Sequence, residues 1–289
     1  MKILQHILYW LIVFTSRMPY FLLYLIADFV YVMMYYVFGY RKEVVFGNLR
    51  RSFPDKSEAE ITKIAKQFYH NLADIQLEAI KSVTVTKEEI LKRVVLRNPE
   101  AMENYTANGD STILATIHKC NWEWALLGYS AGFSITNIDA MYKPLSSKFV
   151  DELMIKVRSK FGATMVADAS ILRRIASSKD KVRTTIMASD QTPAKEAPHK
   201  LMFLNQPTLF FAGIEKIAVL MNVPIIFTDV NRVKRGYYEI TFYPMSVPPY
   251  DKKHPGIVET YAEMTEQAIL RQPQNWLWSH KRWKHEVEM

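Results

Sequence analysis

An alternation of short apolar runs with helical stretches, between residues 113 and 271, constrains the fold more than any other feature of this sequence. The runs are rich in β-branched side chains and short enough for strands. We expect strands at residues 113–117, 135–142, 164–167, 182–188, 224–230 and 237–243. We expect helices at residues 122–129, 148–161, 170–178, 208–221 and 258–271. This order predicts an α/β fold in which helices cover a mixed, largely parallel sheet.

A further helix is expected over residues 57–81, before this alternation begins. Apolar positions such as Ile61, Ile64 and Phe68 recur at spacings of three and four, which predicts one buried face. Ser57 and Glu60 have the spacing of a capping box, in which each side chain bonds to the backbone of the other residue.

The first 40 residues are apolar, and residues 18–40 contain one charged side chain, Asp28. A membrane-spanning helix needs about 20 mostly apolar residues. Asp28 near its centre would cost ~2.5–3.5 kcal/mol, which the surrounding apolar side chains can offset. The tyrosines of this stretch also suit a helix that lies partly in the membrane interface. We therefore expect residues 1–40 to form a membrane anchor and residues 41–289 to form a separate domain.

Two other interpretations of this segment stay open. A secretory signal is disfavoured, because the apolar region is too long and no small-residue cleavage site follows it. The second interpretation is that the segment forms a helical hairpin buried in the core and broken at residues 17–19. If the segment is an anchor, the cations that follow it at Arg41, Lys42, Arg50 and Arg51 place the next domain on the cytoplasmic side.

Composition narrows the classes of partner. The net charge of +8 favours anionic partners such as nucleic acid, anionic lipid headgroups or phosphorylated substrates. Cys120 is the single cysteine, which excludes an intramolecular disulfide and a cysteine-based zinc site. The glycine-rich fingerprints of nucleotide-binding loops are absent from the sequence.

The strand expected at residues 113–117 ends at His118, and Glu123 follows five positions later at the start of the next helix. A carboxylate bonded to one ring nitrogen fixes the tautomer and raises the basicity of the other. The free nitrogen can then take a proton from a hydroxyl group. Asp190 ends another expected strand, and ligands of such sheets bind at the carboxyl ends of strands. The spacing of His118 and Glu123 alone also occurs by chance, and a lone histidine is usually structural.

Six stretches occur in an order that resembles one family. They are FGNLRRSFPDKS (46–57), HKCNWE (118–123), YKPLSSKFVDELMIKVRSKFG (142–162), ASDQTP (188–193), MFLNQPTLFFAGIEKIA (202–218) and NWLWSHKRWK (275–284). Together they resemble the late acyltransferases of lipid A biosynthesis, within the lysophospholipid acyltransferase superfamily. The chain departs from the family pattern at 119–120, where a glycine-bearing pair is common, and at 204–205, where Phe–Gly is usual.

The resemblance implies a glycerolipid acyltransferase-like fold, with an acyltransferase domain at residues 41–289, and transfer of a fatty acyl group from a thioester to a lipid hydroxyl. It implies that His118 is the general base and that Glu123 orients it. The residues implied to bind substrate or shape the site are Arg158, Lys143, Asn121, Asp190 and Gln191. The thioester donor is expected to be acyl-carrier protein or acyl-CoA, and the acceptor a glycolipid or phospholipid.

We further expect no cofactor, no metal and no nucleic-acid partner. We expect a location at the inner (cytoplasmic) membrane, with the catalytic domain on the cytoplasmic face. The spacing of His118, His199 and His254 matches no familiar zinc site, so a metal hydrolase is a weak alternative.

Further alternatives stay open. The acceptor can instead be a lysophospholipid or an amino-acid-containing lipid, and a non-catalytic lipid-binding protein is the alternative from another class. Arg158 and Lys143 can belong to a solvated face, while His280 and Arg282 can be buried structural partners or part of a basic tail that binds headgroups. Phe203, Phe210 and Phe211 line either the core or an acyl tunnel.

Overall fold

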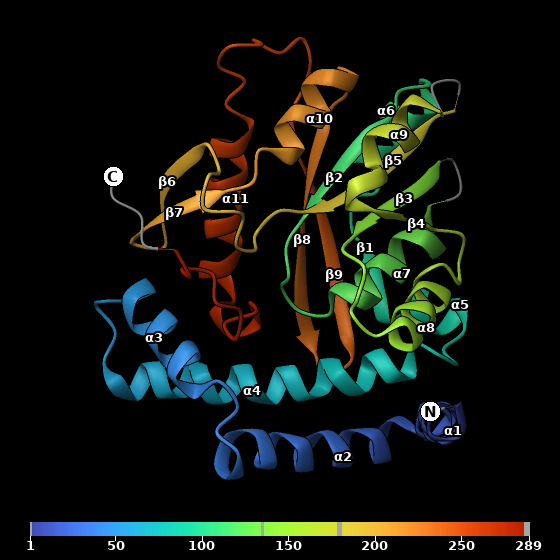
Figure 1. Ribbon diagram of the computed structural model, residues 1–289, viewed down its shortest axis with the longest axis vertical. Helices are drawn as coiled ribbons and strands as arrows, with labels where there is room; N and C mark the ends of the chain where they lie inside the picture. The colour runs from blue at the N-terminus through green and yellow to red at the C-terminus, as the bar shows by residue number, and fades with distance from the viewer. Residues whose placement is uncertain (1, 134–135, 178–180, 286–289) are drawn as a thin grey trace.

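The computed structural model describes residues 2–133, 136–177 and 181–285. Its centre is a seven-stranded sheet with the strand order β1–β9–β8–β2–β5–β3–β4 (Figure 1). Neighbouring strands are parallel except for β8 and β9, which form an antiparallel pair. The strands are β1 (Val94–Leu96), β2 (Thr112–Thr116), β3 (Asn137–Tyr142), β4 (Thr164–Ala167), β5 (Arg183–Ala188), β8 (Ile225–Lys234) and β9 (Tyr237–Ser246). The predicted α/β fold with a mixed, largely parallel sheet is confirmed.

Helices cover this sheet and extend beyond one of its ends (Figure 1). The α-helices are α1 (Lys2–Arg17), α2 (Tyr20–Val32), α3 (Lys42–Ser52), α4 (Glu58–Lys81), α5 (Lys87–Arg93), α6 (Glu100–Ala107), α7 (Trp122–Gly132), α8 (Lys148–Arg158), α9 (Ile171–Ala176), α10 (Gly213–Met221) and α11 (Ile257–Arg271). A π-helix, η1 (Met33–Val37), continues α2, and short 3₁₀ turns are η2 (Asp168–Ser170) and η3 (Pro273–Asn275). Ile135 and Ser178, at the ends of two predicted elements, lie outside the described residues.

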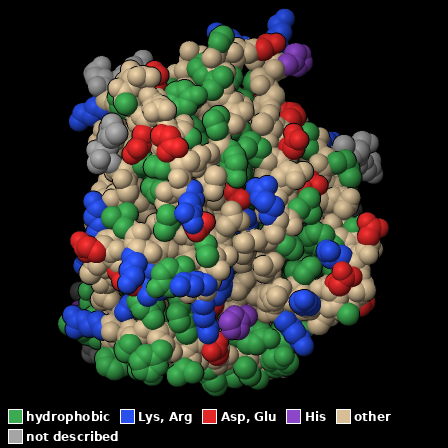
Figure 2. All heavy atoms as spheres, turned by 180° about the vertical axis from the view of Figure 1, so that it is seen from behind, with side chains coloured by type: hydrophobic (Ala, Val, Ile, Leu, Met, Phe, Trp, Pro, Cys, Tyr) green, Lys and Arg blue, Asp and Glu red, His purple; other side chains and the backbone are tan. Residues whose placement is uncertain are grey.

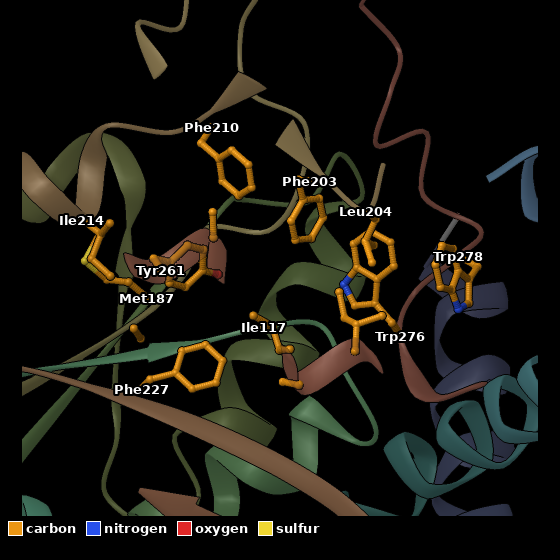
Figure 3. Packing of buried hydrophobic residues seen from close by; sticks show 14 of the residues in the cluster. Ile117, Met187, Phe203, Leu204, Phe210, Ile214, Phe227, Tyr261, Trp276 and Trp278 are labelled. Carbon is orange, nitrogen blue, oxygen red and sulfur yellow. The ribbon is translucent and has the colours of Figure 1, made fainter. Parts of the chain in front are cut away.

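The central strand β2 is buried on both faces, which explains its continuous apolar run. Ile113 and Ala115 face a core cluster that includes residues of α4, α10 and α11. Leu114 faces a second cluster, which includes residues of α5 and α7. Figure 3 shows the first cluster, in which aromatic side chains from distant segments pack together. The alternation along β2 thus places one helical layer on each face of the sheet.

Helix α4 begins with the predicted capping box. The Ser57 hydroxyl accepts a hydrogen bond from the Glu60 amide, while a Glu60 carboxylate oxygen accepts one from the Ser57 amide at 2.8 Å. These bonds satisfy backbone donors that a helix start otherwise leaves unpaired. From there α4 runs across the lower end of the sheet, between the sheet and α2 (Figure 1).

The predicted helix at 208–221 is wrong over its first part. A two-stranded antiparallel hairpin, β6 (His199–Phe203) and β7 (Gln206–Phe210), comes first, and the helix begins only at Gly213. Leu204 and Asn205 form the two-residue loop of this hairpin. Both have positive φ (49° and 60°), as a type I′ turn requires. Leucine is unusual there, but its side chain is only 1 % exposed, so its burial offsets backbone strain.

The N-terminal segment forms α1, α2 and η1 rather than one helix. On one side, Leu23 and Ala27 of α2 pack against Ala73 and Leu77 of α4. Among the described helices, one stretch, Tyr20–Val37, is long and apolar enough to cross a membrane, and 17 % of it is buried. The division of the chain at residue 40 into an anchor and a domain stays a prediction.

The other side of α1 and α2 exposes large apolar side chains. On α2 these are Phe21, Leu25 and Phe29, each at least 60 % exposed. Figure 2 shows hydrophobic side chains gathered along the lower edge of the molecule, the level at which Figure 1 draws α1 and α2. This exposure argues against a hairpin buried in the core.

The close approach of α7 to β1 depends on a glycine. A Cβ atom on Gly128 would lie 2.6 Å from Cγ1 of Val94, a β-branched side chain with little freedom to move away. We expect Gly128→Ala to lower the free energy of unfolding by about 1–3 kcal/mol, as overpacking does. Chemical denaturation of the purified protein measures this. Gly213→Ala is the control, because its Cβ would meet only Met187 Cε at 4.0 Å. Equal losses in both variants would contradict the prediction.

Candidate active site

The site begins where two parallel strands end side by side. Thr116 of β2 pairs with Ala188 of β5, so His118 and Asp190 follow at the same edge of the sheet. His118 Nδ1 lies 2.7 Å from Asp190 Oδ1. Asp190 Oδ2 accepts hydrogen bonds from the His118 amide and from Trp276 Nε1, both at 2.9 Å. The buried carboxylate thus contacts three donor groups and fixes the orientation of the imidazole ring.

The electrostatics of this pair favour the charged forms. Burial alone lowers the pKa of His118, but the neighbouring Asp190 carboxylate outweighs it, and the pKa is raised from its usual 6.5. Burial raises the pKa of Asp190, but the imidazole and the hydrogen bonds outweigh this, so the pKa is lowered. His118 therefore has a stronger base at Nε2 than a free histidine does.

Glu123 does not bond to the His118 ring, contrary to the sequence-based expectation. Its carboxylate accepts two hydrogen bonds from Arg158, from Nε at 2.8 Å and from Nη2 at 2.6 Å. Asp190, which follows the end of β5, bonds to the ring instead. Arg158 lies at the end of α8, and its planar guanidinium binds the Glu123 carboxylate through two parallel hydrogen bonds. Burial lowers the pKa of Arg158, but the bond to Glu123 outweighs it and the pKa is raised.

Glu123 still acts on His118 through space, since its negative charge is a further cause of the raised pKa of His118. Trp122 lies between His118 and Glu123 in the sequence. Its ring contacts the His118 ring edge-on, with centroids 5.5 Å apart. Its Nε1 donates to Glu123 Oε1 at 3.2 Å. The site therefore combines an imidazole, two carboxylates and one guanidinium.

Asn121 caps the start of α7. Its Oδ1 accepts a hydrogen bond from the Trp124 amide at 2.9 Å, and its Nδ2 donates to Glu78 Oε2 at 2.7 Å. The side chain is fully buried, so Asn121 shapes the loop instead of presenting a free polar group to a ligand.

Lys143 and Gln191, the two remaining predicted binding residues, lie at the margins. Lys143 follows β3 and is exposed, and Gln191 follows Asp190 and is half-buried. Neither side chain makes a hydrogen bond or ion pair within the described part of the chain.

The C-terminal segment crosses the site, which sequence reasoning did not foresee. The Leu277 amide donates to the His118 carbonyl at 3.1 Å, and the Cys120 amide donates to the Asn275 carbonyl at 2.8 Å. Trp276 reaches Asp190 from this segment. The tryptophan-rich block at residues 275–284 is the one sequence feature that could have indicated this crossing. The loop after His118, which it contacts, lies more than 150 residues earlier in the sequence.

Lys119 occupies one of the positions where the chain departs from the family pattern. Its Nζ is fully buried and donates to Asp229 Oδ1 at 2.7 Å and to Asn231 Oδ1 at 3.0 Å. Asp229 Oδ2 also accepts a hydrogen bond from Arg271 Nη2 at 2.9 Å. The ion pair ties the residue after His118 to β8, so Lys119 holds the loop in place.

The basic C-terminal tail is partly buried. The Thr192 amide donates to His280 Nε2 at 3.0 Å, and burial lowers the pKa of His280. Arg282 donates to the Leu209 carbonyl at 2.6 Å and lies over the Phe210 ring at 4.6 Å. Burial lowers the pKa of Arg282 to about 10. Arg282 is therefore a structural partner of the hairpin, and His280 is a structural partner of the loop that follows β5.

The phenylalanines of the hairpin region divide between core and surface. Phe203 and Phe210 pack edge-to-face in the core cluster drawn in Figure 3, with centroids 5.3 Å apart. Phe211 is 38 % exposed. Among the described residues, no group of three or more His, Cys, Asp or Glu side chains could hold a metal ion.

A comparison against protein-family models identifies the family of the chain. Residues 1–285 match the family of bacterial lipid A biosynthesis acyltransferases. The chain belongs to this family and is therefore an acyltransferase of lipid A biosynthesis type, with an acyl donor and a lipid acceptor. A search of curated proteins found no match to the chain.

The charge on Asp190 should control the titration of His118. We expect Asp190→Asn to lower the pKa of His118, because the carboxylate is the main group that raises it. Glu123→Gln should lower it by less, since Glu123 contributes more weakly. NMR titration of the His118 ring measures both changes. A larger effect of Glu123→Gln than of Asp190→Asn would contradict this assignment.

Proposed function

We propose that the protein transfers a fatty acyl group from a thioester to a hydroxyl of a lipid A precursor or related bacterial lipid, with His118 as general base. The observation that carries the proposal is the 2.7 Å contact between His118 Nδ1 and Asp190, which leaves Nε2 for a substrate. The match to the family over residues 1–285 supports the reaction class.

In this mechanism Nε2 takes the proton of the acceptor hydroxyl as its oxygen attacks the thioester carbonyl. Asp190 holds the Nδ1 proton and stabilises the imidazolium that forms, and the Glu123 charge adds to this effect. When the tetrahedral intermediate collapses, the C–S bond breaks and the imidazolium returns the proton to the leaving thiolate. The hydroxyl oxygen keeps the acyl group as an ester.

The oxyanion of the intermediate needs donors aimed at it. Two groups suit this role. Arg158 uses Nε and Nη2 on Glu123, which leaves Nη1 for an oxyanion or an acceptor phosphate. The first backbone N–H groups of α7 are the second candidate, because helix starts present unpaired donors. Contacts of Lys143 and Gln191 with the same substrate are part of the proposal, because each follows a strand that ends at the edge of the sheet carrying His118.

Acyl-carrier protein is the proposed donor, with acyl-CoA as the alternative. The net charge of +8 suits an acidic carrier protein, which charge attraction would bring to the surface. The acceptor is a phosphorylated lipid if Arg158 binds phosphate. A lysophospholipid or an amino-acid-containing lipid remains the alternative acceptor.

We also propose that α1 and α2 lie on the cytoplasmic leaflet of the inner membrane. Their outward faces carry large exposed apolar side chains, as an interfacial helix requires. Asp28 supports a helix that lies along the domain over one that spans the bilayer. Its carboxylate binds Arg235 at 2.6 Å and His70 at 3.0 Å, so α2 is fastened to the domain at its middle.

Substitution of the base should nearly abolish turnover. We expect His118→Ala to lower the acyl-transfer rate by about 10²–10⁴-fold. In the wild type the rate should rise as the pH passes through the raised pKa of His118, because the base must be neutral. Asp190→Asn should lower the rate and move this rise to lower pH, since the pKa of His118 falls. Initial rates with an acyl thioester measure these effects.

The control for these variants is Asp110→Asn, which changes an exposed carboxylate away from the site. Mass spectrometry of lipids from cells lacking the gene, complemented with each variant, identifies the acceptor from the lipid that regains an acyl chain. Full turnover in His118→Ala would disprove the proposed base. No regained chain with the wild type would favour a lipid-binding protein.

Charges on the outward face of α2 should release the protein from membranes. We expect Leu25→Glu combined with Phe29→Glu to lower partitioning onto anionic vesicles by on the order of 100-fold, because two exposed apolar side chains lose their burial in lipid. Vesicle co-sedimentation measures this. Leu172→Glu is the control, since Leu172 is 55 % exposed but lies on α9. Equal release by the control would contradict the proposed membrane face.

A further inference from the structure

Glu78 of α4 has a fully buried carboxylate that lies outside the catalytic contacts described above. Its Oε1 accepts a hydrogen bond from the Tyr24 hydroxyl of α2 at 2.8 Å. Its Oε2 accepts one from Asn121 Nδ2 at 2.7 Å and one from the Tyr238 hydroxyl at 2.6 Å. One carboxylate therefore joins α2, the loop before α7, and β9.

We propose that Glu78 is a positioning residue, through which the packing of α2 on α4 holds the loop that carries His118 in its active arrangement. The inference rests on the proposed function, since it adds a residue to that reaction. It also gives α2 a role beyond attachment to lipid.

The cost of burying Glu78 is the first argument. An isolated carboxylate in the core is strongly unfavourable, and burial raises the pKa of Glu78 above its usual range. An apolar side chain would pack α4 against its neighbours without this cost. The carboxylate instead fixes the orientation of its neighbours, because its two oxygens accept hydrogen bonds from three donor groups at set positions.

The path from Glu78 to the site is short. Asn121, which donates to Glu78, also caps α7 through the Trp124 amide. The first turn of this helix carries Trp122, which contacts the His118 ring, and Glu123, which pairs with Arg158. Loss of the bond between Asn121 and Glu78 would leave a buried amide donor unpaired and loosen this turn.

The path from Glu78 to the membrane face runs through Tyr24. Its neighbours on α2, Phe21 and Leu25, expose their side chains outward, while the Tyr24 hydroxyl points inward to Glu78. Arg235 donates to the Tyr24 carbonyl at 3.2 Å and lies over its ring at 4.5 Å, which limits movement of this part of α2. Displacement of α2 would therefore withdraw the Tyr24 hydroxyl from the shared carboxylate.

Cys120 offers a direct readout of the loop. It is the single cysteine, it is 2 % exposed, and it directly precedes Asn121. Burial raises the pKa of its thiol to about 12, so it should react slowly with a thiol reagent while the loop is closed. The labelling rate of Cys120 thus reports opening of the loop without any need for turnover.

The test compares Tyr24→Phe with Tyr250→Phe in the full-length protein bound to anionic vesicles. Both substitutions remove a tyrosine hydroxyl that donates a bond of 2.7–2.8 Å, but the partners of Tyr250 are the Val223 carbonyl and, at 3.2 Å, the Ser246 carbonyl, away from α2. We expect Tyr24→Phe to raise the labelling rate of Cys120 and lower kcat, each by about tenfold, with unchanged vesicle binding. Tyr250→Phe should change neither. Equal labelling in both variants would overturn the proposal.

A donor–acceptor exchange tests the Glu78 contact itself. Asn121→Asp should raise the labelling rate of Cys120, because two carboxyl groups then face each other. Adding Glu78→Gln restores a donor opposite an acceptor, so the double variant should label more slowly than Asn121→Asp alone. Failure of this rescue would also overturn the proposal. If the wild type transfers no acyl group, the proposed function fails, while the labelling rates still decide the role of Glu78.

Discussion

The parallel pairing of β2 with β5 is the contact on which the rest of the site depends. It brings the residues after two strands to one edge, and only there can a buried carboxylate meet an imidazole from a distant part of the chain. Asp190 also accepts a hydrogen bond from Trp276 Nε1. Trp276 belongs to the C-terminal segment, which lies across the loop after His118. One strand pairing thus organises groups from three separate regions of the sequence.

Three ion pairs lie around this edge, each with at least one buried partner. Asp190 meets His118, Glu123 meets Arg158, and Lys119 meets Asp229. Buried pairs of this kind add little net stability, but removing one partner is costly because the other is left unpaired. We infer that they hold the loop in one arrangement, so that the imidazole and the guanidinium are already in place when a substrate arrives.

The sequence predicted the elements whose patterns are local. The run before His118 and the one before Asp190 were identified as strands, and their ends as the site, since apolar runs and strand ends can be recognised without a partner. The pairing of Glu123 with Arg158 was missed, because helical spacing does not reveal which neighbouring helix a side chain faces. The hairpin loop was missed because Leu204 has positive φ, a conformation that leucine rarely adopts and that only its burial compensates.

The attachment of α2 to the body of the protein has a geometric consequence. A flexible linker would let the edge that carries His118 take many heights and tilts above a membrane. Here Asp28, Tyr24 and Leu23 fasten the helix along its length, so the apolar face and the edge that carries His118 keep a fixed relation. With the proposed membrane face resting on a leaflet, the fold itself would set the depth at which an acceptor hydroxyl must lie, and lipids would be selected by the position of their hydroxyl as well as by its chemistry.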